Sequence, residues 1–236
     1  MRNFKKPLLF SAAMLPVIIP AVVLTAFYQM QLYPADIIAG AINQLGSKTA
    51  LIILSAVQGS LLVAVCCFFG YILADKTGLW IPLYIERDKL FKTIALATSA
   101  GLVFSLDYWT FGACELLIQS SITGAGLSAA GFGAAVLYGG IVEEILMKLF
   151  LMSLIAFILW KLFFRSTPKN KLPDIIFISA NIISALLFAA GHLPATAAAF
   201  GALTPMLLAR CFLLNGIFGL LFGRLYRRYW KQWESR

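Results

Sequence analysis

The sequence predicts an all-α, polytopic transmembrane helix bundle of about six spans, with the N- and C-termini in the cytoplasm. Of 236 residues, 61% are hydrophobic and only 12% are charged, and the mean hydropathy is +0.89. A soluble domain cannot hide that much apolar surface behind so few charges. No linker or repeat divides the chain, so residues 1–236 are expected to form a single transmembrane domain.

Each span is predicted from a long, mostly uncharged stretch, because a bilayer core requires roughly 20 apolar residues per helix. These runs are continuous rather than alternating, which excludes the strands of a transmembrane barrel. The fourth stretch is overlong, and Gly139-Gly140 is a candidate break between an entry helix and the span proper. The candidate spans are residues 7–28, 50–74, 93–113, 134–163, 173–191 and 198–223.

The orientation follows from the basic residues, which short cytoplasmic loops retain. Every Lys and Arg except Lys48, Lys148 and Arg210 lies before the first span, after the last, in the second or fourth loop, or, for Lys161, at the inner end of the fourth span. Both termini are therefore predicted inside. Topology and contact with anionic lipid explain the net charge of +9, and no nucleic-acid partner is invoked. Basic loops without an organelle signal favour a bacterial-type plasma membrane.

Five ionisable residues fall inside the predicted spans, where insertion costs roughly 2.5–3.5 kcal/mol or more for a charged group. Such residues usually face a protein interior or a water cavity, and we expect these to gather at one level of the bundle. Asp107, near the outer end of the third span, is interpreted as interfacial. The five residues are Glu143, Glu144, Lys148, His192 and Arg210.

Helical spacing separates the two glutamates. Glu143 and Glu144 differ by about 100° around the helix, and Lys148 lies one turn beyond Glu144, so one glutamate is paired and the other is free. On the fifth span, a polar and aromatic stripe ends at His192, which is expected at the membrane edge. Arg210 is expected within reach of the carboxylates. The other members of the stripe are Asn181, Ser184 and Phe188.

These residue types suit general-base activation of water, with Glu143 as the base and a neutral His192 orienting the same water. A purely structural role is the alternative, because ion pairs and buried hydrogen bonds also hold helices together in membranes. A single histidine beside two carboxylates is a poor zinc site, so we expect neither a metal nor another cofactor.

Two motifs resemble the CPBP family (CAAX protease and bacteriocin-processing, also called Abi), which includes the Ras-converting CAAX endopeptidases. Glu143-Glu144-Ile-Leu-Met-Lys148 is similar to its EExxxR motif, and Phe188-Ala-Ala-Gly-His192 matches its FxxxH motif. The resemblance covers about residues 130–225. It implies an intramembrane glutamic endopeptidase with Glu143 as the water-activating base, His192 as its partner and Glu144 as a supporting carboxylate.

Two departures from the family pattern keep a second hypothesis open. Lys148 replaces the motif arginine, for which Arg210 is a candidate substitute. His192 is the only histidine, so the family's late H-x-x-x-N or H-x-x-x-D motif is missing, and Asn215 is the candidate oxyanion donor. The resemblance thus implies a hydrolase that cleaves a peptide or membrane-protein substrate. The alternative is a catalytically impaired membrane scaffold, immunity or regulatory protein with a membrane-protein partner.

Overall fold

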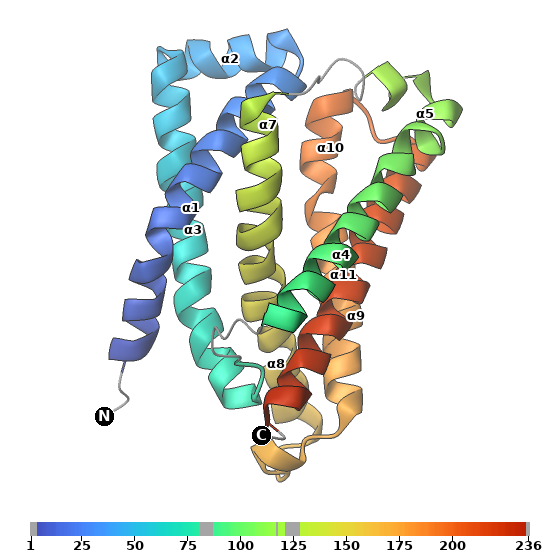
Figure 1. Ribbon diagram of the computed structural model, residues 1–236. Helices are drawn as coiled ribbons and strands as arrows, with labels where there is room; N and C mark the ends of the chain where they lie inside the picture. Colours follow the sequence, from blue (N-terminus) through green and yellow to red (C-terminus); the bar gives the residue numbers. More distant parts are fainter. Residues whose placement is uncertain (1–3, 81–86, 117, 121–127, 235–236) are drawn as a thin grey trace.

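The computed structural model describes residues 4–80, 87–116, 118–120 and 128–234. All regular secondary structure in these ranges is helical, which confirms the predicted all-α bundle (Figure 1). The elements are α1 (Lys5–Leu32), α2 (Ala35–Leu45), α3 (Lys48–Thr77), α4 (Arg87–Ser105), η1 (Leu106–Tyr108), α5 (Phe111–Cys114), α7 (Ala129–Gly133), η2 (Ala134–Val142), η3 (Ile145–Met152), α8 (Ser153–Phe163), η4 (Lys169–Lys171), α9 (Asp174–Gly191), α10 (Leu193–Phe200) and α11 (Pro205–Glu234).

Five helical stretches in the described ranges are long and apolar enough to cross a membrane. They are Lys5–Leu32, Lys48–Thr77, Ala129–Phe163, Asp174–Phe200 and Pro205–Arg227. Figure 1 shows α1 beginning and α11 ending at the same end of the bundle, as the predicted topology requires. Together with the composition, these stretches make the chain an integral membrane protein.

The third predicted span, residues 93–113, corresponds to α4, but the α-helix ends at Ser105. The chain tightens there into the 3₁₀ turn η1, which contains Asp107, and then forms the short helix α5. Asp107 is 6% exposed, so its side chain is buried within the protein, and its predicted position at the depth of the membrane interface stays a prediction. Its burial is possible because a basic partner on α11 compensates its charge, as described below.

Gly139-Gly140 does not break the fourth span, because residues 129–163 form one continuous helix. Much of this helix has the wide π geometry, in η2 and η3 on either side of Glu143-Glu144. Packing holds the helix together, since η2 lies against α1 and η3 lies against α3. Tertiary contacts of this kind override the poor helix propensity of glycine. Wide π turns occur frequently at functional sites.

The boundary between the fifth and sixth predicted spans also differs from the sequence prediction. Instead of ending near His192, the chain turns there and continues as α10, so the whole stretch Asp174–Phe200 counts as one span. Pro194 does not stop the helix because it lies in the first turn, where no backbone N–H is needed. Gly201, with φ +77°, ends α10, and α11 begins at Pro205.

The closely packed side of the bundle is formed by α1, α3, the long helix from η2 to α8, and α9. Its core contains fully buried side chains from each of these elements, among them Ile18, Val63, Val142 and Ile176. The side formed by α4, η1, α10 and the start of α11 is more open, and it is there that the polar residues meet a cavity.

Candidate functional site

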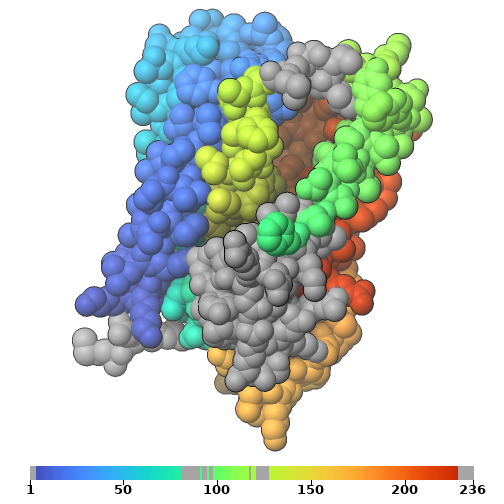
Figure 2. Space-filling view, viewed as in Figure 1, coloured from blue at the N-terminus to red at the C-terminus, as the bar shows by residue number. Residues whose placement is uncertain are grey.

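A cavity of about 1110 Å³ lies between α1, the α7–η2 helix, η1, α9, α10 and α11. Figure 2 shows the hollow between α7 and α4, with α10 at its back. Most of the lining is apolar, and a few ionisable and hydroxyl groups project into it. Its ionisable members are Asp107, Glu143, His192 and Arg210. A mostly apolar cavity with a few convergent polar groups is the usual form of a ligand site.

Glu143 and His192 face each other across this cavity from two different spans. The Oε1 atom of Glu143 lies 3.7 Å from Nε2 of His192, too far for a direct hydrogen bond but close enough for one bridging water. The Glu143 side chain is 29% exposed and that of His192 33%. Because α9 continues into α10, His192 lies inside the helical stretch Asp174–Phe200 rather than at its end.

The orientation of His192 is fixed by its own helix. Its Nδ1 atom lies 2.8 Å from the carbonyl oxygen of Phe188, and the two rings pack edge to face with centroids 4.6 Å apart. A carbonyl oxygen only accepts hydrogen bonds, so Nδ1 carries the proton and donates it. In the neutral imidazole, Nε2 is then an acceptor directed at Glu143.

Glu144 lies outside this arrangement, although it is adjacent to Glu143 in sequence. Its Oε1 atom accepts a 2.6 Å hydrogen bond from Nζ of Lys148, whose side chain is only 2% exposed. The ammonium also lies 5.6 Å from the ring centroid of Phe222 on α11. Within the described chain, neither Glu144 nor Lys148 lines the cavity. The ion pair therefore lies outside the cavity, with Lys148 buried and the Glu144 side chain 42% exposed.

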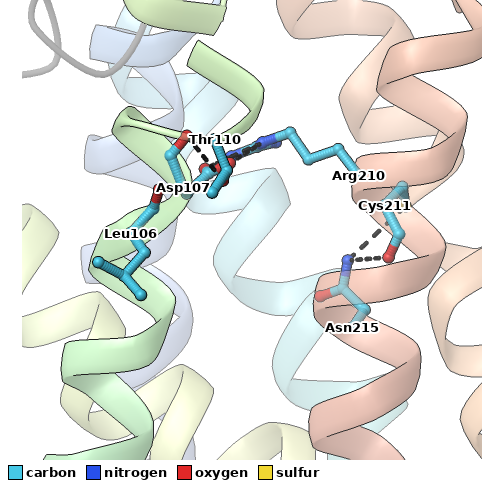
Figure 3. A network of polar contacts seen from close by, with 6 residues as sticks. All are labelled: Leu106, Asp107, Thr110, Arg210, Cys211 and Asn215. Carbon is cyan, nitrogen blue, oxygen red and sulfur yellow. Dashed lines mark hydrogen bonds and ion pairs between the residues drawn. The ribbon is translucent and has the colours of Figure 1, made fainter. Parts of the chain in front are cut away.

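Arg210 does not substitute for the motif arginine, as the sequence analysis had suggested. It contacts neither glutamate and instead forms an ion pair with Asp107, 103 positions earlier in the chain (Figure 3). Nε lies 3.0 Å from both carboxylate oxygens, and Nη2 lies 2.6 Å from Oδ2. Both residues line the cavity, so Arg210 belongs to its wall as expected, but its partner is Asp107 and not a glutamate.

Two polar residues expected to support the site donate to backbone carbonyl oxygens of helices instead. Asn215 donates from Nδ2 to the carbonyl oxygen of Cys211, 3.0 Å away on its own helix (Figure 3). Asn181 donates to the carbonyl oxygen of Leu220 at 2.9 Å and ties α9 to α11. Neither belongs to the described lining of the cavity. The expectation that Asn215 would donate to an oxyanion is therefore not supported.

Sequence reasoning missed the tyrosine hydroxyls of the cavity, which come from three separate segments. Burial raises the pKa of Tyr33, just beyond the first span, so this phenol stays protonated and remains a hydrogen-bond donor. Tyrosines near span ends usually indicate interfacial anchoring, and no spacing signal connects positions so distant in sequence. The four tyrosines are Tyr28, Tyr33, Tyr108 and Tyr138.

Among the described residues, no group of three or more His, Cys, Asp or Glu side chains is placed to hold a metal ion. The Glu143–His192 pair provides only two such groups. That the protein works without a metal ion stays a prediction, which activity measured with and without a chelator would test.

Fold and site together define a polytopic membrane protein with a glutamate–histidine pair in a cavity inside the bundle. Residues 125–234 match the family model described as Type II CAAX prenyl endopeptidase Rce1-like. This match confirms the resemblance to the CPBP, or CAAX-protease, family that the two motifs indicated for this part of the chain. No curated protein and no solved structure matches the chain.

Proposed function

We propose that the protein is an intramembrane endopeptidase in which Glu143 and His192 activate water for peptide-bond hydrolysis. The observation that carries the proposal is the 3.7 Å approach of the two side chains inside a cavity, within the family-matched part of the chain. The family match supports a CAAX-type membrane protease. The two residues and their chemistry are our inference.

The hydrogen-bonding character of the pair suits one bridging water. An ionised Glu143 and the Nε2 atom of a neutral His192 both accept hydrogen bonds, so the water donates one hydrogen to each. Its oxygen lone pairs then remain available to attack a carbonyl carbon. As the new C–O bond forms, Glu143 takes the water proton, and proton transfer to the leaving amine accompanies cleavage of the C–N bond.

Glu144 and Lys148 support this reaction indirectly. Their ion pair fixes the rotation of the long helix, and adjacent residues on a helix point about 100° apart. With Glu144 bound to Lys148 on the packed side, Glu143 is turned toward the cavity. Phe188 contributes in the same way, because its carbonyl oxygen holds the histidine ring in place.

The substrate we propose is a peptide or membrane-protein segment, reached from the lipid or from the membrane surface. A large apolar lining suits a lipid-modified chain, in keeping with the prenyl endopeptidase description of the family. The protein itself is proposed to reside in a bacterial-type plasma membrane. Lipid surrounds the bundle, and no nucleic acid takes part.

The proposal is tested by comparing the two adjacent glutamates in one assay. We expect Glu143→Gln, in proteoliposomes with an internally quenched farnesylated peptide, to lower kcat by about 10³-fold, because the general base is lost. Glu144→Gln, the same change one residue away, should retain at least about a tenth of the wild-type kcat when folded protein is compared. Wild-type-like cleavage by Glu143→Gln would exclude the mechanism.

A catalytically impaired scaffold or regulatory protein remains the second candidate. One observation favours it, because Asn215 is bonded within its own helix and does not supply the late donor of the family. Losing an oxyanion donor typically costs about 10²–10³ in rate. A membrane-protein partner retained equally by wild type and Glu143→Gln, with no cleavage product from the farnesylated peptide, would support this reading.

A further inference from the structure

The ion pair between Asp107 and Arg210 lies in the wall of the same cavity as Glu143 and His192, yet the water-activating step does not use it. We propose that Arg210, held in place by Asp107, binds a backbone carbonyl oxygen of the peptide in the cavity. The inference rests on the proposed function in one respect, namely that the occupant of the cavity is a peptide.

The geometry leaves part of the guanidinium available to such a ligand. Asp107 is bound through Nε and Nη2, and Nη1 has no hydrogen bond among the described residues. The Arg210 side chain is 21% exposed, whereas that of Asp107 is 7% exposed. Arginine carries five N–H donors in a rigid fork. Those not directed at Asp107 remain to contact an occupant of the cavity.

The charge of the pair indicates which kind of acceptor it suits. The Asp107 carboxylate compensates the guanidinium charge at hydrogen-bond distance, so the pair presents donors with little net charge. A free carboxylate would gain little from such a site and would lie near the aspartate, which repels it. A neutral carbonyl oxygen avoids this repulsion and still accepts a hydrogen bond from a charged donor.

Asp107 is accordingly a positioning residue. It lies in η1, the turn that ends α4, and its two oxygens hold the guanidinium that extends from α11 (Figure 3). Thr110, also in this segment, bonds back to the carbonyl oxygen of Leu106 and stabilises the turn. The bidentate contact between Asp107 and Arg210 fixes the direction of the remaining N–H groups of the guanidinium.

The test measures binding without cleavage, on full-length Glu143→Gln protein in detergent micelles. Two probes are compared, a farnesylated tetrapeptide ending in a free carboxylate and the same peptide ending in an amide. We expect Arg210→Gln to weaken both probes equally, by about 10- to 100-fold, because a charged hydrogen bond to a shared carbonyl is lost. Arg224→Gln, the same change at an exposed site on α11, should leave both affinities unchanged.

A second variant distinguishes positioning from simple structural support. Asp107→Asn removes the compensating charge, so the unpaired guanidinium should now favour the acid probe over the amide probe by about 10-fold. Purely structural damage would weaken both probes without changing their ratio, and that result would overturn the role of Asp107. A melting temperature measured for each variant identifies unfolded protein, and Arg210→Lys provides a charge-conserving replacement where Arg210→Gln does not fold.

The inference fails if adding Arg210→Gln to the Glu143→Gln protein leaves the affinity for both probes unchanged in folded protein, or if only the binding of the acid probe is weakened. It also fails if the Glu143→Gln protein itself binds neither probe. These results are separate from the failure of the proposed mechanism, which is wild-type-like cleavage by Glu143→Gln. The binding measurements can therefore contradict the contact between Arg210 and a peptide carbonyl while the role of Glu143 and His192 remains. The cleavage assay can likewise contradict the role of Glu143 and His192 while the Arg210 contact remains.

Discussion

Among the described residues, two ion pairs each have one almost fully buried member, Lys148 in one and Asp107 in the other, and their surroundings differ. On the packed side, Lys148 is almost fully buried and bonds Glu144 against the ring of Phe222. On the cavity side, the Asp107–Arg210 pair lies beside open volume that also reaches Glu143 and His192. In the proposed assignment, open space beside a charged group, more than the charge itself, separates a binding group from a structural one.

The comparison predicts that substitutions on the cavity side change activity, and the largest loss of kcat in this comparison is expected at His192. We expect His192→Gln to lower kcat by about 10²- to 10³-fold, because the ring that orients the water is lost. The folded state should change little, since a third of the side chain is already exposed. Steady-state kinetics on the farnesylated peptide, with a thermal melt as control, measure the two quantities. A large drop in melting temperature that accompanies the loss of kcat would instead assign His192 a packing role.

At the Glu144–Lys148 ion pair we expect a loss of stability whose free energy is similar to that of the loss of kcat at His192. Glu144→Gln leaves the buried Lys148 ammonium without its counter-charge and should lower the free energy of unfolding by about 3 kcal/mol. Adding Lys148→Met to that variant removes the uncompensated charge and should restore most of the loss. Denaturant titration in mixed micelles measures both variants. A double variant no more stable than Glu144→Gln would contradict the assignment.

The smallest expected effect compares two glycines. A Cβ added at Gly70 on α3 would lie 3.0 Å from the backbone oxygen of Leu149, so Gly70→Ala must separate α3 from η3 and should cost about 1–2 kcal/mol. At Gly101 on α4 nothing lies within 4 Å, and Gly101→Ala should be neutral or stabilise by up to about 1 kcal/mol. Equal melting temperatures for both would show that the two sides are packed alike.

The features that local spacing controls were predictable from sequence. Hydropathy and charge bias fixed the class of fold, because both depend only on composition along the chain. The different directions of Glu143 and Glu144, and the pairing of Glu144 with Lys148, follow from helical spacing. Even where the helix adopts wide π turns, residues adjacent in sequence still point different ways.

The features that depend on distant segments were not predictable. Asp107 and Arg210 are 103 positions apart, and no periodic pattern connects a 3₁₀ turn to a later helix. The fifth span was expected to end near His192, whereas the helical stretch continues into α10, whose first turn holds Pro194 without needing its backbone N–H. Asn215 was expected to work as a donor, but its amide reaches the backbone one turn earlier in its own helix.

The adjacent residues Glu143 and Glu144 lie at the junction of η2 and η3. A π turn accommodates one more residue than an α turn, so deleting a single residue from η2 would let the helix wind more tightly. Because the tighter winding absorbs the missing residue, the segment beyond would keep its rotation. Glu143 would still face the histidine and Glu144 would still reach Lys148, so the wide turns of η2 would tolerate the loss of one codon without changing which carboxylate meets the histidine.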